Sequence, residues 1–458
     1  MHLGNARTAL FNYLLARARG GRFVLRVEDT DAGRGDESYL EAQLEDLRWL
    51  GLEWDAGPGR EDGRGPYRQS ARGELYEVHY RRLVESGVAY PCYCSPAELE
   101  VSRRTQLAAG RPPRYEGTCR GLDQAGRARQ EAAGRRPTLR FRVPEGRRVA
   151  FEDLVRGPQD FATDDLGDFV IRRADGHPVF FFCNALDDAL MGITQVLRGE
   201  DHVANTPRQL LLLEELGLAA PAYGHLPLLL GGDGTPLSKR RGSTSVGDLR
   251  AAGYLPEAVA NYLLRLGHAG APDDWVPWAE QPAAFVLERI GRSPAHYDEV
   301  QLQHWQREGV KRLAPEALDA WLAPALPSGL DPARRRLLAR TVSHNVLFPA
   351  DARPWVDVLF GELPPPGEEV EALLAEAGPG FFDAALAAIP AAGADLPALA
   401  REIRRRTGRK GAALYMPLRA ALTGRRDGPE LGPIVAALGT DQLEKRFGAH
   451  AAPAEDRH

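Results

Sequence analysis

Lysine is scarce in this chain of 458 residues, where Lys239, Lys311, Lys410 and Lys445 stand beside 54 arginines. Most arginines therefore reflect composition, and an arginine-rich patch is weak evidence for a polyanionic partner. A lysine in a short polar motif is a stronger signal, and Lys239 is the only lysine in the first 310 residues. The net charge of -5 still permits nucleic-acid binding, because phosphate contacts need only local basic surface.

Cysteines and long apolar runs are also scarce. The chain has four cysteines, of which Cys92 and Cys94 are too close for an easy disulfide, so we expect a reducing compartment and a cytoplasmic location. No stretch approaches about 18 uninterrupted apolar residues, and the first residues lack a secretory pattern, so we expect no membrane segment. The 43% apolar and 26% charged residues predict a globular chain with a sizeable core.

The first 85 residues alternate between helix and strand patterns. Apolar residues recur at helical spacing over 5–17 and 37–50, and residues 22–27 alternate as a strand that ends in the acidic cluster 28–31. This alternation predicts an α/β fold with a doubly wound parallel sheet. Ligands of such sheets lie beyond the carboxyl ends of the strands, which is where the acidic cluster falls.

Later parts of the chain differ in composition. Residues 90–148 hold three cysteines, many arginines and few long apolar runs, which indicates a subdomain inserted into the sheet. Beyond about Ser293 helical spacing continues almost without strand patterns, so we predict an all-α region there.

Two short motifs carry candidate chemistry. His2-Leu-Gly4-Asn5 precedes the first helix, where a glycine admits a flat ligand, and free N–H groups and a histidine can face phosphate oxygens. Leu237-Ser-Lys-Arg240 lies in a glycine-flanked loop, from which a lysine can stabilise charge as pyrophosphate leaves. Taken alone, the first motif is more often a plain helix N-cap and the second a solvated loop. Only the two motifs together indicate a nucleotide site.

In this order the two motifs resemble the signatures of class I aminoacyl-tRNA synthetases. Four further blocks resemble bacterial glutamyl-tRNA synthetase in particular: Arg26-Val-Glu-Asp-Thr-Asp31, Pro66-Tyr-Arg-Gln-Ser70, Leu186-Asp-Asp188 with Met191-Gly-Ile-Thr194, and Arg198-Gly-Glu-Asp201. The resemblance extends into the helical region, at 410–424 and 428–429, and so covers nearly the whole chain.

The resemblance implies a glutamate–tRNA ligase. Such an enzyme activates L-glutamate with ATP and magnesium to glutamyl-adenylate and transfers the glutamyl group to the 3′ end of tRNA-Glu; the resemblance also implies a monomer. It assigns catalysis to His2 and Lys239. Its other binding groups are Gly4, Asn5, Ser238 and Arg240 for ATP, together with both catalytic residues, and Glu28, Asn184 and Arg198 for glutamate. An arginine fork suits a side-chain carboxylate, and no general base is required because positioning and charge supply the rate.

The same resemblance divides the chain into six parts. Residues 1–85 and 186–240 are the two halves of a Rossmann-like nucleotide-binding core, 86–185 an inserted acceptor-binding subdomain, and 241–300 a stem-contact region. Residues 301–385 and 386–458 are the two parts of an all-α anticodon-binding region.

Three features depart from the family pattern. Phe180 stands where the family usually has a tyrosine, and Pro236 stands where the loop motif often has its first lysine. The family also has a strand before the histidine motif, with an arginine and a Pro-Ser-Pro turn, whereas this chain begins at Met1. Because a missing central strand would leave its neighbours unpaired, we expect the gene to encode that strand upstream.

Cys92-x-Cys94 and Tyr115-x3-Cys119 predict a zinc site. Three thiolates suit zinc, and the insertion has too little apolar content to fold comfortably unaided. The family places the fourth ligand at Tyr115 or at a position that is Gly121 here, which makes Tyr115 the better candidate and Asp123 the reserve. The alternative is three reduced cysteines in a metal-free remnant.

Two other functions remain open. A related enzyme that loads glutamate onto a modified base of tRNA-Asp shares the cysteine pattern but lacks the helical half. A non-catalytic tRNA-binding paralogue would fit the departures at Phe180 and Pro236. Glutaminyl-tRNA synthetase is disfavoured because its bacterial form has β-barrels where this chain is helical, and the sequence does not decide whether tRNA-Gln is also charged.

Overall fold

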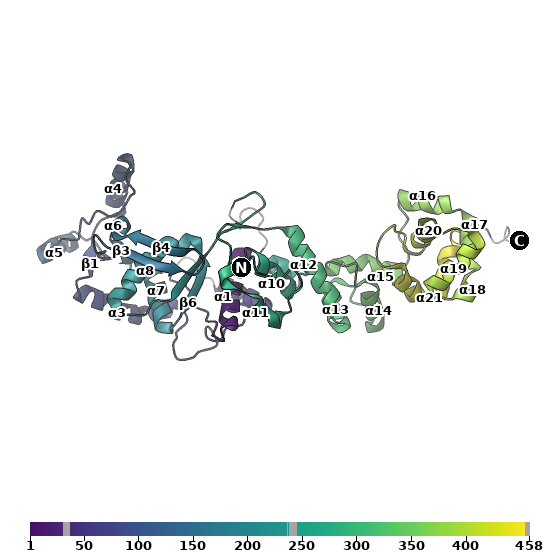
Figure 1. Cartoon of the computed structure of the whole chain (residues 1–458), viewed down its shortest axis with the longest axis horizontal. Helices are drawn as coiled ribbons and strands as arrows, with labels where there is room; N and C mark the ends of the chain where they lie inside the picture. The colour runs from purple at the N-terminus through teal and green to yellow at the C-terminus, as the bar shows by residue number, and fades with distance from the viewer. Residues whose placement is uncertain (31–36, 236, 238–244, 454–458) are drawn as a thin grey trace. The chain divides into compact units, whose positions relative to one another are not determined.

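The computed structural model describes residues 1–30, 37–235, 237 and 245–453 (Figure 1). The chain divides into two compact units, one of residues Met1–Asp248 with Ala260–Asp298 and one of Leu249–Val259 with Glu299–His458. Pro236, Ser238, Lys239 and Arg240 lie outside the described residues.

A parallel pair of strands forms the centre of the first unit. β6 (Gln195–Gly199) pairs in parallel with β7 (Ala222–Leu226), and α8 (Thr206–Leu216) connects them. α7 (Phe180–Met191) packs on α8, and α1 (Leu3–Ala18) packs on β6. From α1, Asn12 donates to the carbonyl of Leu197 (2.8 Å) and accepts from its N–H (3.0 Å), so a side chain satisfies the edge of β6. The predicted α/β core is confirmed.

The predicted strand over 22–27 is only partly formed. Phe23 and Leu25 pair with residues 55 and 56, whereas Val27 pairs with Tyr67 and Gln69. The partner segment changes in the middle, so the structure has two isolated parallel bridges, at Val24 and Val27, in place of a continuous ladder. The predicted helix over 37–50 is present as α2 (Glu37–Trp49), and α3 (Gly73–Glu85) follows the 67–69 segment.

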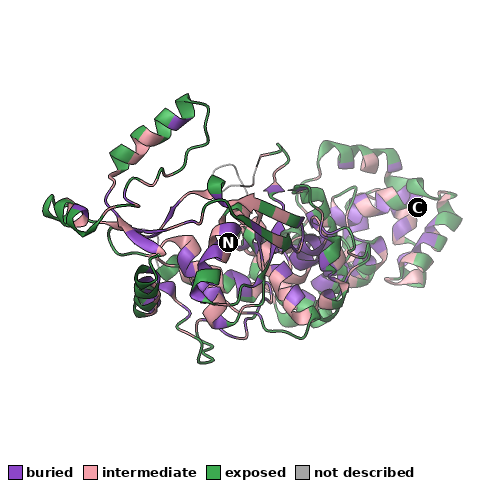
Figure 2. Ribbon diagram, turned by 60° about the vertical axis from the view of Figure 1, so that its left-hand side comes forward, coloured by how far each residue is buried: buried purple, intermediate pink, exposed green. Residues whose placement is uncertain are grey.

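The segment between α3 and α7 builds its own antiparallel sheet, with strand order β1-β2-β5. Phe141 of β2 and Ile171 of β5 share a buried cluster with Tyr80 of α3 and Phe182 of α7, so this sheet is fused to the core. Figure 2 shows α4 reaching out from the body with a largely exposed surface. The elements are β1 (Ala89–Cys92), α4 (Pro96–Ala108), α5 (Gln124–Ala132), β2 (Thr138–Phe141), the hairpin β3 (Arg148–Asp153) and β4 (Gly157–Ala162), α6 (Thr163–Leu166) and β5 (Phe169–Arg172).

The rest of the first unit packs around α1. Phe11 of α1 lies against Phe285 (ring centroids 5.1 Å apart) and His268 (6.4 Å). A short parallel pair of strands, β8 (Leu229–Leu230) with β9 (Ala295–His296), joins the end of this unit to the segment after β7. The helices here are α9 (Val246–Ala252), α10 (Pro256–Arg265) and α11 (Gln281–Ala284), of which α9 and α10 also enter the second unit.

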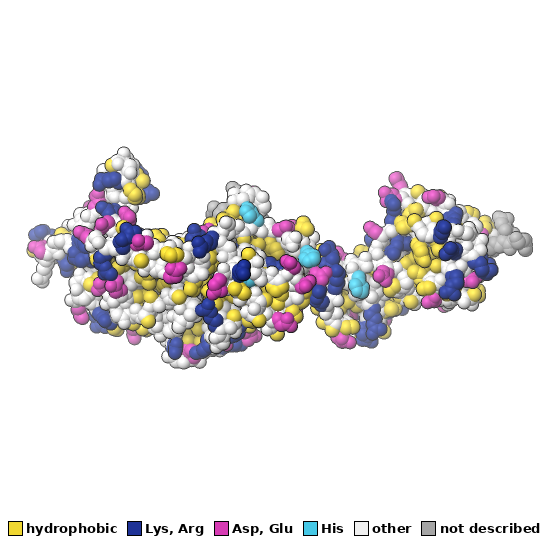
Figure 3. All heavy atoms as spheres, in the orientation of Figure 1, with side chains coloured by type: hydrophobic (Ala, Val, Ile, Leu, Met, Phe, Trp, Pro, Cys, Tyr) yellow, Lys and Arg dark blue, Asp and Glu magenta, His cyan; other side chains and the backbone are white. Residues whose placement is uncertain are grey.

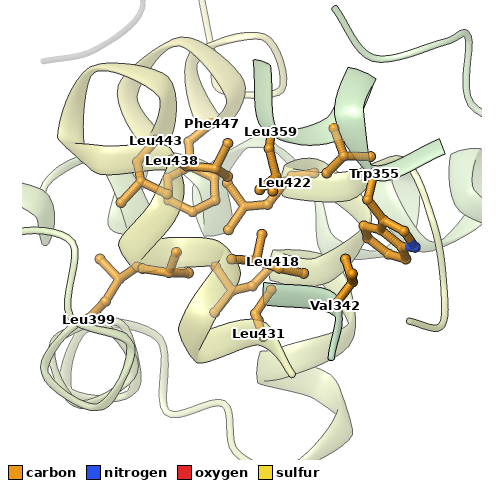
Figure 4. Close-up of a cluster of buried hydrophobic side chains, with 14 of the residues drawn as sticks. Val342, Trp355, Leu359, Leu399, Leu418, Leu422, Leu431, Leu438, Leu443 and Phe447 are labelled. Carbon is orange, nitrogen blue, oxygen red and sulfur yellow. The ribbon is translucent and has the colours of Figure 1, made fainter. Parts of the chain in front are cut away.

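Between Glu299 and residue 453 the described chain consists of helices and connecting loops, with no strand, which confirms the predicted all-α region. Its core gathers side chains from most of these helices, among them Val342, Trp355, Leu418 and Phe447 (Figure 4). The helices are α12 (Glu299–Arg312), α13 (Pro315–Leu322), α14 (Pro332–Val342), α15 (Arg353–Phe360), α16 (Glu368–Ala377), α17 (Pro379–Leu386), α18 (Ile389–Ala392), α19 (Leu396–Thr407), α20 (Ala412–Thr423) and α21 (Leu431–Gly448).

Gly428 shows why the turn between α20 and α21 needs glycine. Its φ is +127°, and an added Cβ would lie 2.2 Å from the Trp355 ring. A side chain there would therefore be strained and would displace a core tryptophan.

No single helix in the described part of the chain is long and apolar enough to cross a membrane. α16 and the helical stretch Pro379–Ala392 meet the length and composition test only as a pair, and they are bent by 75° at the break between them.

Candidate active site

Asp187 is a buried carboxylate that links α7 to the segment before it in the fold. It is fully buried on α7, and it accepts hydrogen bonds from Gln69 Nε2 (2.9 Å), Arg72 Nε (2.6 Å) and Tyr76 Oη (2.7 Å). The Arg72 side chain is also buried, so this is an ion pair with additional hydrogen bonds inside the core. It fixes the 66–70 block against α7, which carries other site residues.

Arg198 presents a buried guanidinium with an uneven set of partners. The residue is 8% exposed at the end of β6, and its Nε donates to His225 Nε2 (3.0 Å). Its Nη2 donates to Thr206 Oγ1 (2.8 Å) and Gln209 Oε1 (2.7 Å), while Nη1 is buried and has no partner. The Tyr223 ring lies 4.6 Å from the guanidinium carbon. Burial lowers the pKa of Arg198, which an incoming anion would offset.

A chain of amides connects Arg198 to Glu28. Gln209, which accepts from Arg198, donates through Nε2 to Asn184 Oδ1 (2.8 Å), and Asn184 Nδ2 donates to Glu28 Oε1 (2.8 Å). Glu28 also accepts from Arg26 Nη2 (3.0 Å). The three predicted glutamate-binding residues are therefore brought together, with a cation at one end of the chain and a carboxylate at the other.

Four buried polar atoms near this series of hydrogen bonds have no hydrogen-bond partner in the described structure. They are Arg26 Nε, Asp188 Oδ2, Arg198 Nη1 and Tyr223 Oη. Asp188 pairs with Arg26 Nη1 (2.7 Å) through its other oxygen, and burial raises its pKa although this guanidinium opposes the shift. Because buried polar groups are normally satisfied, a cluster of unsatisfied ones is typical of a ligand site.

Phe180 lies at the first position of α7, with its ring 5.2 Å from the ring of His202. It offers no hydroxyl, as the sequence indicates. Tyr223 lies on β7, the strand that pairs with β6, and supplies a buried hydroxyl near Arg198.

The motif at the start of the chain lies beside Ser245, the described residue that follows segment 238–244. His2 is the N-cap residue of α1, followed by Gly4 and the exposed Asn5 in the first turn. The backbone of His2 bridges Ser245, the first described residue after Lys239. Before the loop, Leu237 N–H donates to the Leu229 carbonyl (3.1 Å). Both described flanks of the loop are thus held by the first unit.

Three cysteine sulfurs converge in the insertion. The Sγ atoms of Cys92, Cys94 and Cys119 all lie within 4.8 Å of one another, and all four cysteines of the chain are free thiols. The Tyr115 hydroxyl lies 3.3 Å from Cys92 Sγ and 3.8 Å from Cys94 Sγ. Burial and the neighbouring Cys92 raise the pKa of Cys94 to about 12.

The reserve ligand Asp123 has a structural task. It is the N-cap of α5, and its carboxylate accepts from Gly126 N–H (2.7 Å). Three cysteine sulfurs are donors that zinc prefers, and the Asp123 carboxylate is not among the candidate ligand atoms that gather with them. The predicted residues therefore fit the metal, with Tyr115 better placed than Asp123.

Comparison with known proteins decides the family. A model described as "tRNA synthetases class I (E and Q), catalytic domain" matches residues 1–303, about two thirds of the chain. This chain belongs to that family. A second model, described as "Anticodon binding domain", matches residues 368–451.

Several members of the class I tRNA synthetases are similar over almost their whole length. Glutamate–tRNA ligase 2 of Alkalilimnicola ehrlichii is 54% identical over 96% of this chain and 93% of its own. Glutamate–tRNA ligase 2 of Nitrosococcus oceani is 52% identical over 98% and 95%. A crystal structure of a glutamate tRNA ligase from Elizabethkingia meningosepticum, in complex with its amino acid, has a TM-score of 0.87 at 26% identity and covers 98% of this chain and 96% of that one.

Sequence reasoning overlooked several residues of this synthetase site. His225 lies in the otherwise apolar strand β7, where a lone polar residue is a signal that would have identified it. Gln209 follows Arg208 in the polar first turn of α8 and carries no such signal. Asp153 and Thr206 carry no comparable local signal.

Proposed function

We propose that this chain is a glutamate–tRNA ligase, which joins L-glutamate to tRNA-Glu through glutamyl-adenylate. The observation that carries the proposal is Arg198: a buried guanidinium whose Nη1 has no partner fits a side-chain carboxylate. The names of the relatives and of the solved neighbour support the same substrate.

In this proposal Glu28 receives the α-amino group of glutamate, because an ionised carboxylate suits an ammonium and Asn184 holds one of its oxygens. Arg198 binds the side-chain carboxylate. The glutamate α-carboxylate attacks the α-phosphate of magnesium-bound ATP, and pyrophosphate leaves. His2 and Lys239, helped by Gly4, Asn5, Ser238 and Arg240, stabilise charge on the phosphates.

The tRNA contacts complete the proposal. We assign the 3′ end to the insertion over 86–185, the stem to 241–300, and the anticodon to the helical parts 301–385 and 386–458. A hollow of about 870 Å³ lies beside the cysteine cluster in this part of the unit, and both basic residues, such as Arg103 and Arg208, and acidic residues, such as Glu116, line it. Elsewhere basic and acidic side chains are interspersed over the face shown in Figure 3.

We also propose a cytoplasmic monomer. Four free thiols suit a reducing compartment. One chain carries every group named above, so the proposed chemistry requires no second copy.

Charging assays test the proposed function. The chain with ATP, magnesium and tRNA-Glu should form 3′-glutamyl-tRNA, and tRNA-Asp should stay uncharged. Glutamate on tRNA-Asp would favour the enzyme that modifies a base of that tRNA. Binding of tRNA without glutamate-dependent pyrophosphate exchange would favour the non-catalytic paralogue.

We propose one zinc ion in the insertion, held by Cys92, Cys94, Tyr115 and Cys119. The ion would pin the end of β1 to the loop around Tyr115, a structural role. Protein purified without chelator should contain one zinc per chain, and Cys119→Ser should lose most of it. Cys183→Ala, which changes the remaining cysteine, on α7, should keep it.

Metal analysis of the unchanged protein can overturn this proposal. Zinc well below one equivalent, in protein whose insertion is still folded, would establish the metal-free remnant. Tyr115→Phe keeps the three sulfurs, so weakened but measurable zinc binding would support the tyrosine as fourth ligand.

A further inference from the structure

All three protein groups that accept hydrogen bonds from Arg198 are neutral. His225 Nε2, Thr206 Oγ1 and Gln209 Oε1 lie 3.0, 2.8 and 2.7 Å from the guanidinium nitrogens that donate to them. Arg72 of the same unit pairs with a carboxylate, that of Asp187. The buried Arg7, like Arg198, donates only to neutral acceptors. The Arg198 charge is therefore held in place by hydrogen bonds that do not neutralise it.

The neighbouring carboxylates have partners of their own. Glu28 accepts from Arg26 and Asn184, and Asp188 accepts from Arg26. Neither makes a hydrogen bond to Arg198 in the described structure. Arg198 Nη1 therefore remains available to a ligand.

The geometry around His225 fixes its tautomer. Guanidinium nitrogens only donate, so His225 Nε2 must accept from Arg198 and cannot carry a proton. The proton is therefore on Nδ1, which donates to Asp153 Oδ2. Thr206 Oγ1 lies 3.2 Å from the same Nε2.

The hydrogen bonds around Asp153 favour its ionised form. It is 2% exposed at the end of β3, and its Oδ1 accepts from the N–H groups of Val155 (2.9 Å), Arg156 (2.8 Å) and His225 (3.1 Å). Although burial raises the pKa of Asp153, its hydrogen bonds to His225 and to these backbone N–H groups lower it below the usual range overall. A hairpin 72 residues away in sequence thus supplies an anion to β7.

We propose that Asp153 and His225 are positioning residues that set the specificity for glutamate over glutamine, an inference that rests on the proposed function. Asp153 holds His225 as the neutral Nδ1–H tautomer. His225 then orients the Arg198 fork without placing a carboxylate in direct contact with it. A carboxylate substrate gains the full ion pair, whereas the amide of glutamine leaves a buried cation unpaired.

Asp153→Asn is the decisive variant, because it keeps the shape and changes the tautomer. The amide would donate to His225 Nδ1, which moves the proton to Nε2 and sets two donors, Nε2 and Arg198 Nε, against each other. We expect kcat/KM for glutamate to fall on the order of 10–100-fold, mainly through KM, with the KM for ATP unchanged. The ratio of kcat/KM for glutamate to that for glutamine should fall about tenfold or more.

Three further variants separate positioning from folding. His225→Gln retains an acceptor for Arg198 and a donor for Asp153, so it should keep most of the discrimination, whereas His225→Leu should lose it. Asp160→Asn removes the same charge from an exposed site on β4 of the same hairpin and should change nothing. The ratio of two substrates does not depend on the fraction of active protein, so partial unfolding cannot imitate the effect.

The outcomes distinguish this inference from the proposed function. If the unchanged chain uses neither amino acid, the proposed function fails. If the unchanged chain is active and Asp153→Asn and His225→Leu keep its discrimination, the positioning role is wrong although the function stands.

Discussion

Replacing Arg198 by leucine is expected to lower kcat/KM for glutamate on the order of 10³-fold. The change removes the cation proposed for the side-chain carboxylate, and breaking a buried ion pair on one side costs about 3–5 kcal/mol. It also leaves His225 Nε2 and Gln209 Oε1 without their donor. Glutamine should lose far less, so the preference for glutamate should collapse. Glutamate- and glutamine-dependent pyrophosphate exchange in the presence of tRNA measures both.

Arg148→Leu is the matched control for this prediction. Arg148 is an exposed arginine of the same unit, paired with Asp160 across the β3–β4 hairpin. Its loss should leave both rates within a few-fold of the parent. An equal fall for glutamate and glutamine in Arg198→Leu would instead make Arg198 a general binding or structural group.

Lys239→Ala is expected to slow adenylate formation on the order of 10²–10³-fold, as for loss of one preorganised donor at a charged transition state. The first 310 residues contain no other lysine. The affinity for tRNA should stay nearly intact, because tRNA binding uses many other basic groups. Rapid-kinetic measurement of glutamate-dependent ATP consumption in the presence of tRNA gives the rate.

Lys311→Ala is the control for Lys239. Lys311 lies on α12 in the second unit, where it is paired with Glu308 (2.8 Å). Its removal should not change adenylate formation. A Lys239→Ala variant with activity within a few-fold of the parent would refute the assigned role.

Local patterns predicted the first two helices and the all-α region. α1 and α2 begin and end within two residues of the periodic segments, because their apolar spacing and flanking glycines are local signals. The strand over 22–27 was predicted less well. Its pairing is divided between residues 55–56 and residues 67–69, which is a tertiary event that no local pattern contains.

The candidate site shows the same division. Glu28, Asn184 and Arg198 were identified through motifs, and the structure places them in one hydrogen-bonded chain. The residues that orient these three side chains were not identified from the sequence. Asp153 acts on His225 across 72 positions, and nothing in the sequence around Asp153 distinguishes it from a surface acid.

A crystal structure of the chain with glutamate and a non-hydrolysable ATP analogue tests the central claim most directly. The account predicts a side-chain carboxylate oxygen within hydrogen-bond distance, about 3 Å, of Arg198 Nη1. The α-amino group should lie beside Glu28. Glutamate bound with its side chain away from Arg198, and Nη1 still unpartnered, would contradict it.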